Sequence, residues 1–202
     1  MLRRTIHRPA HLYKESAIYF IGASTLARQP LFEPPHRRSL VMEVFDRVAR
    51  EAGRPIYAWF VGVDHYHILL GVGGKQVPIE PLLGCKEEDA PTRHFDLGRL
   101  MNRAHSAIGL LLNREDRMPG RRVFYQYWDR YMRSEGELYT ALNYIHNNPV
   151  KHGYVENLEQ AREYAFSSLP RCHARYGTEW VSECFYRYPV KDHTAEEFDE
   201  RG

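Results

Sequence analysis

The sequence lacks the features that mark disulfide-rich, zinc-binding or membrane-spanning proteins. It contains only three cysteines in 202 residues, Cys85, Cys172 and Cys184, and no two of them form a C-x-x-C pair. This odd number without pairing argues against a disulfide framework and against a structural zinc site. No stretch approaches the roughly 18 apolar residues of a membrane span, and the basic start lacks the apolar stretch of a secretory signal. We therefore expect a cytoplasmic protein that does not enter the membrane.

Net charge and composition give only a weak indication of the partner. The net charge is +2, with 43% hydrophobic and 27% charged residues, as in an ordinary soluble domain with a core of its own. The end of the chain, over 192–200, is acidic. Arginines crowd the start and a later aromatic stretch: Arg3, Arg4 and Arg8, then Arg121, Arg122, Arg130 and Arg133. A basic body with an acidic tail fits nucleic-acid binding, as it fits many other soluble proteins.

Hydrophobic periodicity predicts alternating strands and helices. β-forming residues predict four strands, over 17–25, 55–63, 65–71 and 123–132. Apolar residues at helical spacing predict a helix over 40–52, capped by Ser39, and helices over 96–113 and 135–147, the last ended by Pro149. A shorter helix or turn is expected within 158–169. The second helix is predicted to direct Leu97, Leu100, Met101, Ala104, Ile108 and Leu111 to the core.

This order of elements predicts the fold class. Strand, helix, strand, strand, helix, strand indicates an α+β fold with one antiparallel sheet and helices packed on one face, close to the ferredoxin-like split βαβ pattern. We divide the chain into a basic N-terminal arm (1–14), one folded domain (15–170) and an irregular C-terminal tail (171–202). The segment over 72–96 is expected to be a loop or an insertion.

The strongest chemical signal is a His-x-His pair in a predicted strand. His65 and His67 flank Tyr66. Because side chains alternate between faces along a strand, both imidazoles point the same way, about 7 Å apart, and can converge on one metal ion. Tyr66 then points to the opposite face. The short pattern is also compatible with two solvent-facing histidines on an edge strand.

A second signal lies at the end of the third predicted helix. Tyr144 and Asn148 are four positions apart, so their side chains share one helix face. A nucleophilic hydroxyl and an oxygen ligand would then be presented together to a metal ion held by the histidines. Two simpler interpretations stay open: Tyr144 packs its ring on the core, and Asn148 caps the helix before Pro149.

Taken together, these motifs resemble the single-tyrosine HUH transposases, and most of all their REP-associated tyrosine transposase branch. The resemblance covers roughly residues 15–170. It is carried by HYH over 65–67, YIHNNPVKHG over 144–153 and YAFSSL over 164–169, with weaker matches in RQPLF over 28–32 and FYQYWD over 124–129. Insertion-sequence members usually place glutamine four residues after the tyrosine, whereas Asn148 agrees with the REP-associated branch.

The resemblance implies the HUH endonuclease fold and a DNA-cleaving and rejoining enzyme. A tyrosine hydroxyl with its ordinary pKa of about 10 is a poor nucleophile at pH 7, and a divalent ion on the scissile phosphate compensates. His65, His67 and Asn148 are the implied ligands of Mg²⁺ or Mn²⁺, and Tyr144 is the implied attacking group. The implied product is a 5′-phosphotyrosine link with a released 3′-hydroxyl. The implied substrate is single-stranded or hairpin DNA with palindromic repeats, and the protein is a monomer or a homodimer.

Contacts to DNA beyond this centre are predicted from basic residues interleaved with aromatic ones, because cations follow phosphates while rings stack on unpaired bases. The candidates are Arg3, Arg4, Arg121, Arg122, Arg130, Arg133 and Lys151. The competing interpretation is that most of the aromatic residues over 124–131 belong to the core. His146 lies on a different face of the tyrosine helix and is expected to be structural.

Three other functions remain compatible with the sequence. The first is a non-catalytic, regulatory descendant of the same fold that binds hairpin DNA without cutting it. The second is a metal-dependent hydrolase that uses activated water, with Tyr144 structural. The third is an RNA-binding module of ferredoxin-like fold, which would stack bases on the sheet and need no metal. A covalent protein–DNA adduct would separate the transposase-like enzyme from all three.

Overall fold

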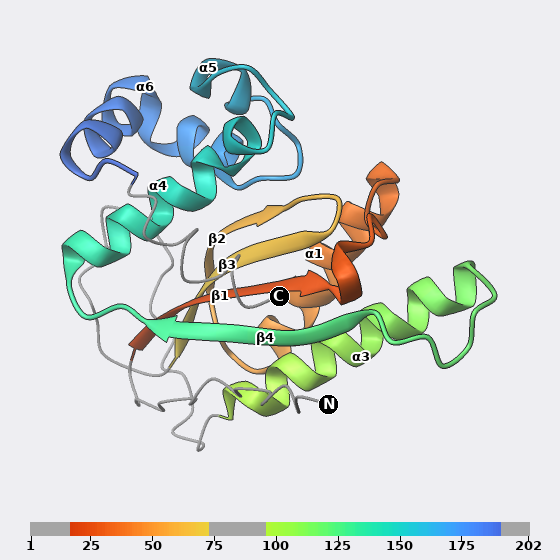
Figure 1. Ribbon diagram of the computed structural model, residues 1–202. Helices are drawn as coiled ribbons and strands as arrows, with labels where there is room; N and C mark the ends of the chain where they lie inside the picture. Colours follow the sequence, from red (N-terminus) through yellow and green to blue (C-terminus); the bar gives the residue numbers. More distant parts are fainter. Residues whose placement is uncertain (1–16, 73–95, 191–202) are drawn as a thin grey trace, which may run out of the picture.

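The computed structural model describes residues 17–72 and 96–190, in which one four-stranded antiparallel sheet forms the centre (Figure 1). Its strands are β1 (Ala17–Thr25), β2 (Ile56–Val61), β3 (His65–Val72) and β4 (Phe124–Tyr131). The spatial order is β2-β3-β1-β4, and each neighbouring pair is antiparallel. With one helix between β1 and β2 and another between β3 and β4, this is the ferredoxin-like split βαβ arrangement. The predicted α+β class is therefore confirmed.

Most helix bounds differ from the predicted ones by a few residues, although the third predicted helix begins at residue 135 as expected. The helices are α1 (Pro35–Glu51), α3 (Leu97–Glu115), α4 (Glu135–Lys151), the short α5 (Leu158–Ala161) and α6 (Leu169–Arg187), with a 3₁₀ turn η1 (Leu26–Arg28). Helix α1 starts at Pro35 rather than after Ser39, because proline is well suited to the first helical position. Helix α4 runs through Pro149, which removes one backbone donor close to the helix end, where little of the helix is lost.

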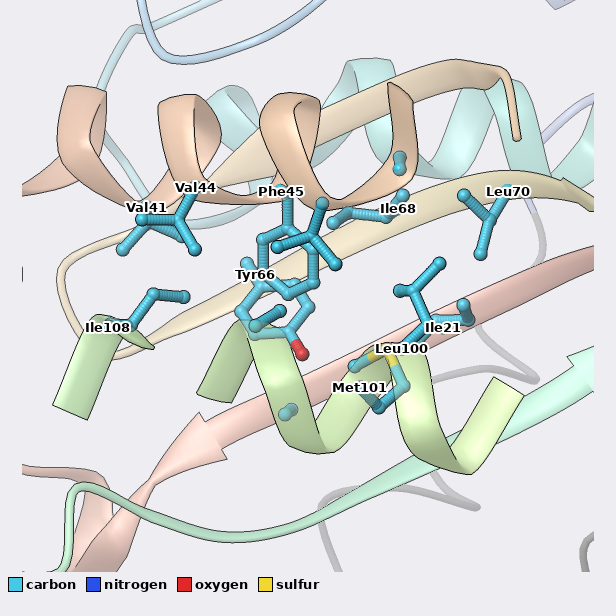
Figure 2. Close-up of a cluster of buried hydrophobic side chains, with 14 of the residues drawn as sticks. Ile21, Val41, Val44, Phe45, Tyr66, Ile68, Leu70, Leu100, Met101 and Ile108 are labelled. Atoms are coloured by element: carbon cyan, nitrogen blue, oxygen red, sulfur yellow. The ribbon is translucent and has the colours of Figure 1, made fainter. Parts of the chain in front are cut away.

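One face of the sheet carries the larger core, against α1 and α3 (Figure 2). Side chains from the sheet, α1 and α3 meet there: Ile21, Val41, Val44, Phe45, Tyr66, Ile68, Leu70, Leu100, Met101 and Ile108. The predicted inward face of α3 is confirmed except at Leu111, which is 38% exposed. The buried stripe continues from Ile108 to Leu112 at i+4 spacing, so Leu111 lies beside it.

The other face of the sheet is covered too, so the prediction of helices on one face needs correction. Helix α4 packs there, and a second core forms between it and the strands. Its main members are Ile18, Phe20, Ala58, Phe60, Leu69, Leu138, Ala141, Leu142 and Ile145. Along β1, Ile18 and Phe20 face α4 while Tyr19 and Ile21 face the first core, as strand alternation requires. The continuous apolar run of β1 is the sequence sign of this two-sided burial.

The predicted irregular tail from residue 171 is wrong, because α6 continues the fold to Arg187. The helix is kinked at Gly177, which has a φ of 82°, and that break interrupts the apolar periodicity in the sequence. Its Cys184 joins the core under α4. Backbone bonds from Val61 N to Phe166 O (2.9 Å) and from Ser168 N to Trp59 O (2.9 Å) attach the preceding segment to β2.

His146 has the structural role that the sequence predicts. Its Nε2 lies 2.9 Å from Ser168 Oγ, which also accepts the Trp59 N–H. Burial lowers the pKa of His146 to about 3, so the ring is neutral at pH 7. The imidazole therefore ties α4 to the segment that borders β2.

Three predictions lie outside the described residues. They are the basic arm with Arg3, Arg4 and Arg8, most of the loop or insertion over 72–96, and the acidic end after residue 191. None of the helices in the described ranges is both long enough and apolar enough to cross a membrane.

The packing of α3 predicts opposite outcomes for two neighbouring truncations. Ile108 is fully buried, so Ile108→Ala leaves a cavity and should lower the free energy of unfolding by about 2–5 kcal/mol. Leu110 is 70% exposed, and Leu110→Ala should change it by less than about 0.5 kcal/mol. Urea unfolding of both variants measures the difference, and equal losses would contradict the orientation of α3.

Candidate active site between the sheet and helix α4

Two histidines of β3 face helix α4. His65 and His67 are 4% and 8% exposed, and their ring centroids lie 5.3 Å apart. Tyr66 between them points into the core on the opposite face, so the predicted alternation is confirmed. Because β3 is a central strand and both rings are buried, the alternative of two solvent-facing histidines on an edge strand is wrong.

Two glycines make room for these imidazoles. Gly22 of β1 lies opposite His67 on one side and Trp128 on the other. A Cβ atom at Gly22 would lie 2.5 Å from Cζ2 of Trp128 and 2.9 Å from Nδ1 of His67. A Cβ atom at Gly62 would lie 2.8 Å from Cε1 of His65. All three distances are shorter than real Cβ contacts, so the site requires glycine at these positions.

Asp64 fixes the tautomer of His65. Its Oδ1 lies 2.6 Å from His65 Nδ1, and an ionised carboxylate can only accept, so Nδ1 donates. Burial favours a higher pKa for Asp64, but the hydrogen bond from His65 and the charges of His65 and Arg28 hold the pKa below its ordinary value. His65 Nε2, on the other side of the ring, is buried without a hydrogen-bond partner.

Arg28 reaches the same carboxylate from a strained turn. Its Nη1 lies 3.5 Å from Asp64 Oδ2. Ala27 and Arg28 have φ values of 55° and 53°, in the left-handed region that costs a non-glycine residue about 1–2 kcal/mol. Thr25 N donates to Asp64 O at 2.7 Å and holds the turn in place. Strain of this kind concentrates at functional sites, and the sequence analysis did not identify Arg28 as a site residue.

Tyr144 lies beside the histidines on the facing helix. It is 5% exposed, with its ring centroid 5.3 Å from that of His67 and 5.7 Å from that of Phe20. Lys151, two turns further along α4, places Nζ 3.5 Å from the tyrosine hydroxyl and 5.1 Å from the ring centroid. The ring thus packs on the core and also directs its hydroxyl toward the cation.

Asn148 is buried one turn beyond Tyr144. Its Nδ2 donates to Tyr144 O at 2.7 Å, which orients the amide, and its Oδ1 is buried without a partner. The residue lies inside α4, and the C-cap is His152. The interpretation of Asn148 as a helix cap is therefore wrong.

The residues predicted as metal ligands each carry a buried polar atom without a hydrogen-bond partner. These atoms are His65 Nε2, His67 Nδ1 and Asn148 Oδ1. Leaving such an atom unpaired costs about 1–3 kcal/mol. Imidazole nitrogen and amide oxygen are ligands of divalent ions, and a carboxylate on the far nitrogen is the usual support of a ligating histidine. The residues therefore fit a metal ion, although no three His, Cys, Asp or Glu side chains in the described ranges form such a group.

His152 and Tyr154 close the site beyond α4. The His152 ring lies 4.5 Å from that of His65 and stacks on Phe60 at 6.1 Å. Burial, with the nearby charges of His65 and Lys151, lowers the pKa of His152 to about 4. Tyr154 Oη accepts the Val63 N–H at 2.9 Å and fixes the turn that leads into β3. His152 lies within the tyrosine-helix motif over 144–153, next to the predicted DNA contact Lys151, whereas Tyr154 lies just beyond the motif and was not predicted.

The predicted DNA-binding residues fall into two groups. Arg130 and Lys151 lie on the same side of the sheet as Tyr144: Arg130 is opposite Phe20 in β4, and Lys151 is on α4 beside the tyrosine hydroxyl. Arg121, Arg122 and Arg133 are engaged elsewhere. Arg121 bonds Asp116 (2.6 Å) and Asn113 (3.0 Å), Arg122 bonds the carbonyls of Phe124 and Tyr125, and Arg133 lies over the Tyr131 ring. Contact of any of them with DNA stays a prediction.

A separate surface cavity lies away from these residues. It has a volume of about 880 Å³ and lies between α1 and α3, lined by residues that include Arg47, Asp96, Arg99 and Arg103. These helices cover the opposite face of the sheet, so the cavity is not part of the candidate site.

Comparisons with known proteins bear on the fold. No protein-family profile and no curated protein matches the chain. Among solved structures, the chain is similar to a REP-associated tyrosine transposase bound to a REP hairpin, at 19% identity and a TM-score of 0.59, over 84% of this chain and 86% of that one. A proposed transposase from Deinococcus radiodurans R1 aligns at 15% identity and a TM-score of 0.43, over 70% of this chain and 97% of that one. The first likeness confirms the HUH transposase fold that the sequence motifs predict.

The close approach at Gly22 predicts a local destabilisation. Gly22→Ala places a methyl group against Trp128 and His67 and should lower the free energy of unfolding by about 1–3 kcal/mol. Gly136→Ala, where the nearest atom is Ser134 Oγ at 3.9 Å, is the matched control and should be neutral or slightly stabilising. If urea unfolding shows Gly22→Ala to be as stable as Gly136→Ala, the packing of the two rings over β1 is wrong.

Proposed function

We propose that this protein is a metal-dependent, transposase-like enzyme that cleaves and rejoins single-stranded DNA through a covalent bond to Tyr144. The observation that carries the proposal is the meeting of two independent elements. Strand β3 supplies buried His65 and His67, and helix α4 supplies Tyr144 and Asn148. The two elements are far apart in sequence and meet on one side of the sheet. The strand contributes unpaired histidine nitrogens, and the helix contributes the unpaired Asn148 oxygen and the Tyr144 hydroxyl.

The chain's own residues account for positioning of the nucleophile. Tyr144 is held by edge contact with Phe20 and by the buried packing of α4, so its hydroxyl has few orientations to lose on reaction. Lys151 is 3.5 Å from that hydroxyl, and its ammonium favours the negative charge of an attacking phenolate and of a phosphate beside it. Arg28 supplies a second cation at the Asp64 side of the site.

His65, His67 and Asn148 would hold the ion. A bound Mg²⁺ or Mn²⁺ supplies Lewis-acid polarisation of the scissile phosphoryl group. Asp64 keeps His65 Nε2 available as a ligand by accepting from Nδ1.

The proposed cleavage needs no reactant other than the DNA strand and the Tyr144 hydroxyl. The Tyr144 oxygen forms a bond to phosphorus and releases its proton, the bond from phosphorus to the 3′-oxygen breaks, and that oxygen leaves as a 3′-hydroxyl after taking up a proton. The 5′-phosphotyrosine link conserves the phosphodiester energy, so attack by a 3′-hydroxyl reverses the step and rejoins the strand.

Hairpin DNA is the substrate class that we propose. The solved relative of the same fold is bound to a REP hairpin, which supports this choice. The chain would act on palindromic repeats as a monomer or a homodimer, and a regulatory descendant that binds without cutting is the second candidate. That second candidate predicts tight binding of hairpins by every variant and cleavage by none.

The covalent step gives the first prediction of function. Incubation of labelled hairpin oligonucleotides carrying single-stranded flanks with Mg²⁺ or Mn²⁺ should give a protein–DNA adduct that survives a denaturing gel. Tyr144→Phe should abolish the adduct, and His65→Ala/His67→Ala should reduce it at least about 100-fold. Tyr139→Phe, on the same helix but packed against Tyr188, is the matched control and should retain the adduct.

Two outcomes would reject this mechanism. Strand cleavage that persists in Tyr144→Phe would make water the nucleophile and the protein a hydrolase. If the wild type and all variants bind hairpins from a panel of palindromic repeats but none forms an adduct, the regulatory descendant is favoured.

Metal affinity gives a prediction that does not depend on cleavage. Asp64→Asn replaces the charged acceptor of His65 Nδ1, and the dissociation constant of Mn²⁺ measured by calorimetry should rise by about 10–100-fold. Asn148→Ala should weaken binding as well, because a ligand oxygen is lost. His173→Ala is the control, since that half-buried imidazole bonds Thr178 and lies on α6, away from the candidate site. If the Mn²⁺ affinity is unchanged in both Asp64→Asn and Asn148→Ala, the proposed metal site is wrong.

A further inference from the structure

Strand β4 carries a half-buried indole next to the candidate active site. Trp128 lies opposite Gly22, and its ring centroid is 5.0 Å from that of Phe20 and 6.1 Å from that of His67. Phe20 in turn contacts the ring of Tyr144 at 5.7 Å. The indole is therefore one aromatic ring away from the proposed nucleophile, on the same face of the sheet.

Arg130 extends the same face of β4. It lies opposite Phe20 in the register, two residues from Trp128, so the two side chains project on one side about 7 Å apart. Asp129 between them projects to the other face. The Nε atom of Arg130 is buried and has no hydrogen-bond partner. A buried guanidinium nitrogen without an acceptor is costly unless a ligand supplies one.

The position of β4 in the sheet suits an extended ligand. It is the last strand in the order of the described sheet, so the ligand would pass along its outer side. Along this edge strand an aromatic ring and a guanidinium lie on one face, two residues apart. A single strand of nucleic acid offers a base and a phosphate in each nucleotide, and proteins bind it with stacking rings and with cations that follow the backbone.

We propose that Trp128 and Arg130 form a subsite for the unpaired nucleotide next to the scissile phosphate. The indole stacks on the base, and the Arg130 guanidinium binds the backbone phosphate. The subsite rests on the proposed function, because it takes its meaning from the DNA strand that reaches Tyr144. A base within a duplex is already stacked on both faces, so the subsite selects single-stranded DNA over duplex DNA.

The other two tryptophans serve as internal references. The sequence contains three tryptophans. Trp59 packs against the core under α1 and α3 on the opposite face of the sheet. Trp180 contacts Tyr139 and Tyr176 in the α4–α6 region. Within the described residues, neither indole has a ring contact with Phe20, His67 or Tyr144.

Tryptophan fluorescence tests the stacking without catalysis. The full chain with Tyr144→Phe is titrated in metal-free buffer with a 12-nucleotide oligothymidylate and with a blunt duplex of the same length. The single strand should quench the emission, and quenching should survive Trp59→Phe and Trp180→Phe but disappear in Trp128→Phe. Because phenylalanine still stacks, Trp128→Phe should keep the affinity within about threefold, whereas Trp128→Leu should lose roughly 5- to 100-fold.

Salt dependence separates the arginine from the indole. Arg130→Gln should lower the slope of log affinity against log salt concentration by about 0.7, the value for one phosphate contact on a single strand. Trp128→Leu should leave this slope unchanged, and Arg130→Lys should restore it. Urea unfolding of each variant confirms that it is folded under the conditions of the titration.

The outcomes distinguish the subsite from the proposed enzyme. If the quenching depends on Trp128 but the wild-type protein forms no adduct, the proposed subsite stands and the proposed enzymatic activity is rejected. Quenching that persists in Trp128→Phe, full affinity in Trp128→Leu, duplex binding equal to single-strand binding, or no binding of the single strand would each overturn the subsite. An adduct that still forms in that case would leave the enzyme standing.

Discussion

Three buried polar atoms without protein partners are the constraint on which this structure depends. His65 Nε2, His67 Nδ1 and Asn148 Oδ1 come from a central strand and a facing helix, and none is satisfied within the described residues. A fold keeps such costly atoms in place when a ligand satisfies them. Two imidazoles and one amide oxygen suit a divalent ion, which is the ligand that we propose for these atoms.

Much of the surrounding fold can be understood as support for this arrangement. The sheet is buried on both faces, so α1 and α3 stabilise it from one side and leave the other to α4 and its tyrosine. Gly22 and Gly62 create the space that the imidazoles occupy. Asp64 orients one ring, and a strained turn brings Arg28 to the same carboxylate. Each of these features has a local cost or requirement, and together they hold the candidate site in one geometry.

Local patterns were enough to predict the strands, the order of elements and the candidate ligands. Alternation along β3 placed His65 and His67 on one face because that periodicity is fixed by the backbone. Long-range packing could not be predicted in the same way. Helix α6 is interrupted at Gly177 and depends on contacts with α4, so its sequence resembles a tail. Arg28 and Trp128 lie in the weaker motif matches over 28–32 and 124–129. Which side chains of these stretches border the site follows from the pairing of strands distant in sequence.

The most direct test of the central claim is the location of the ion itself. Crystals of the protein soaked in Mn²⁺ should show one strong anomalous difference peak between β3 and α4. The account predicts that the peak lies about 2.0–2.4 Å from His65 Nε2, from a ring nitrogen of His67 and from Asn148 Oδ1. A peak held by other residues, or none at this position at saturating Mn²⁺, would contradict the account, because the three buried atoms would then have no ligand to satisfy them.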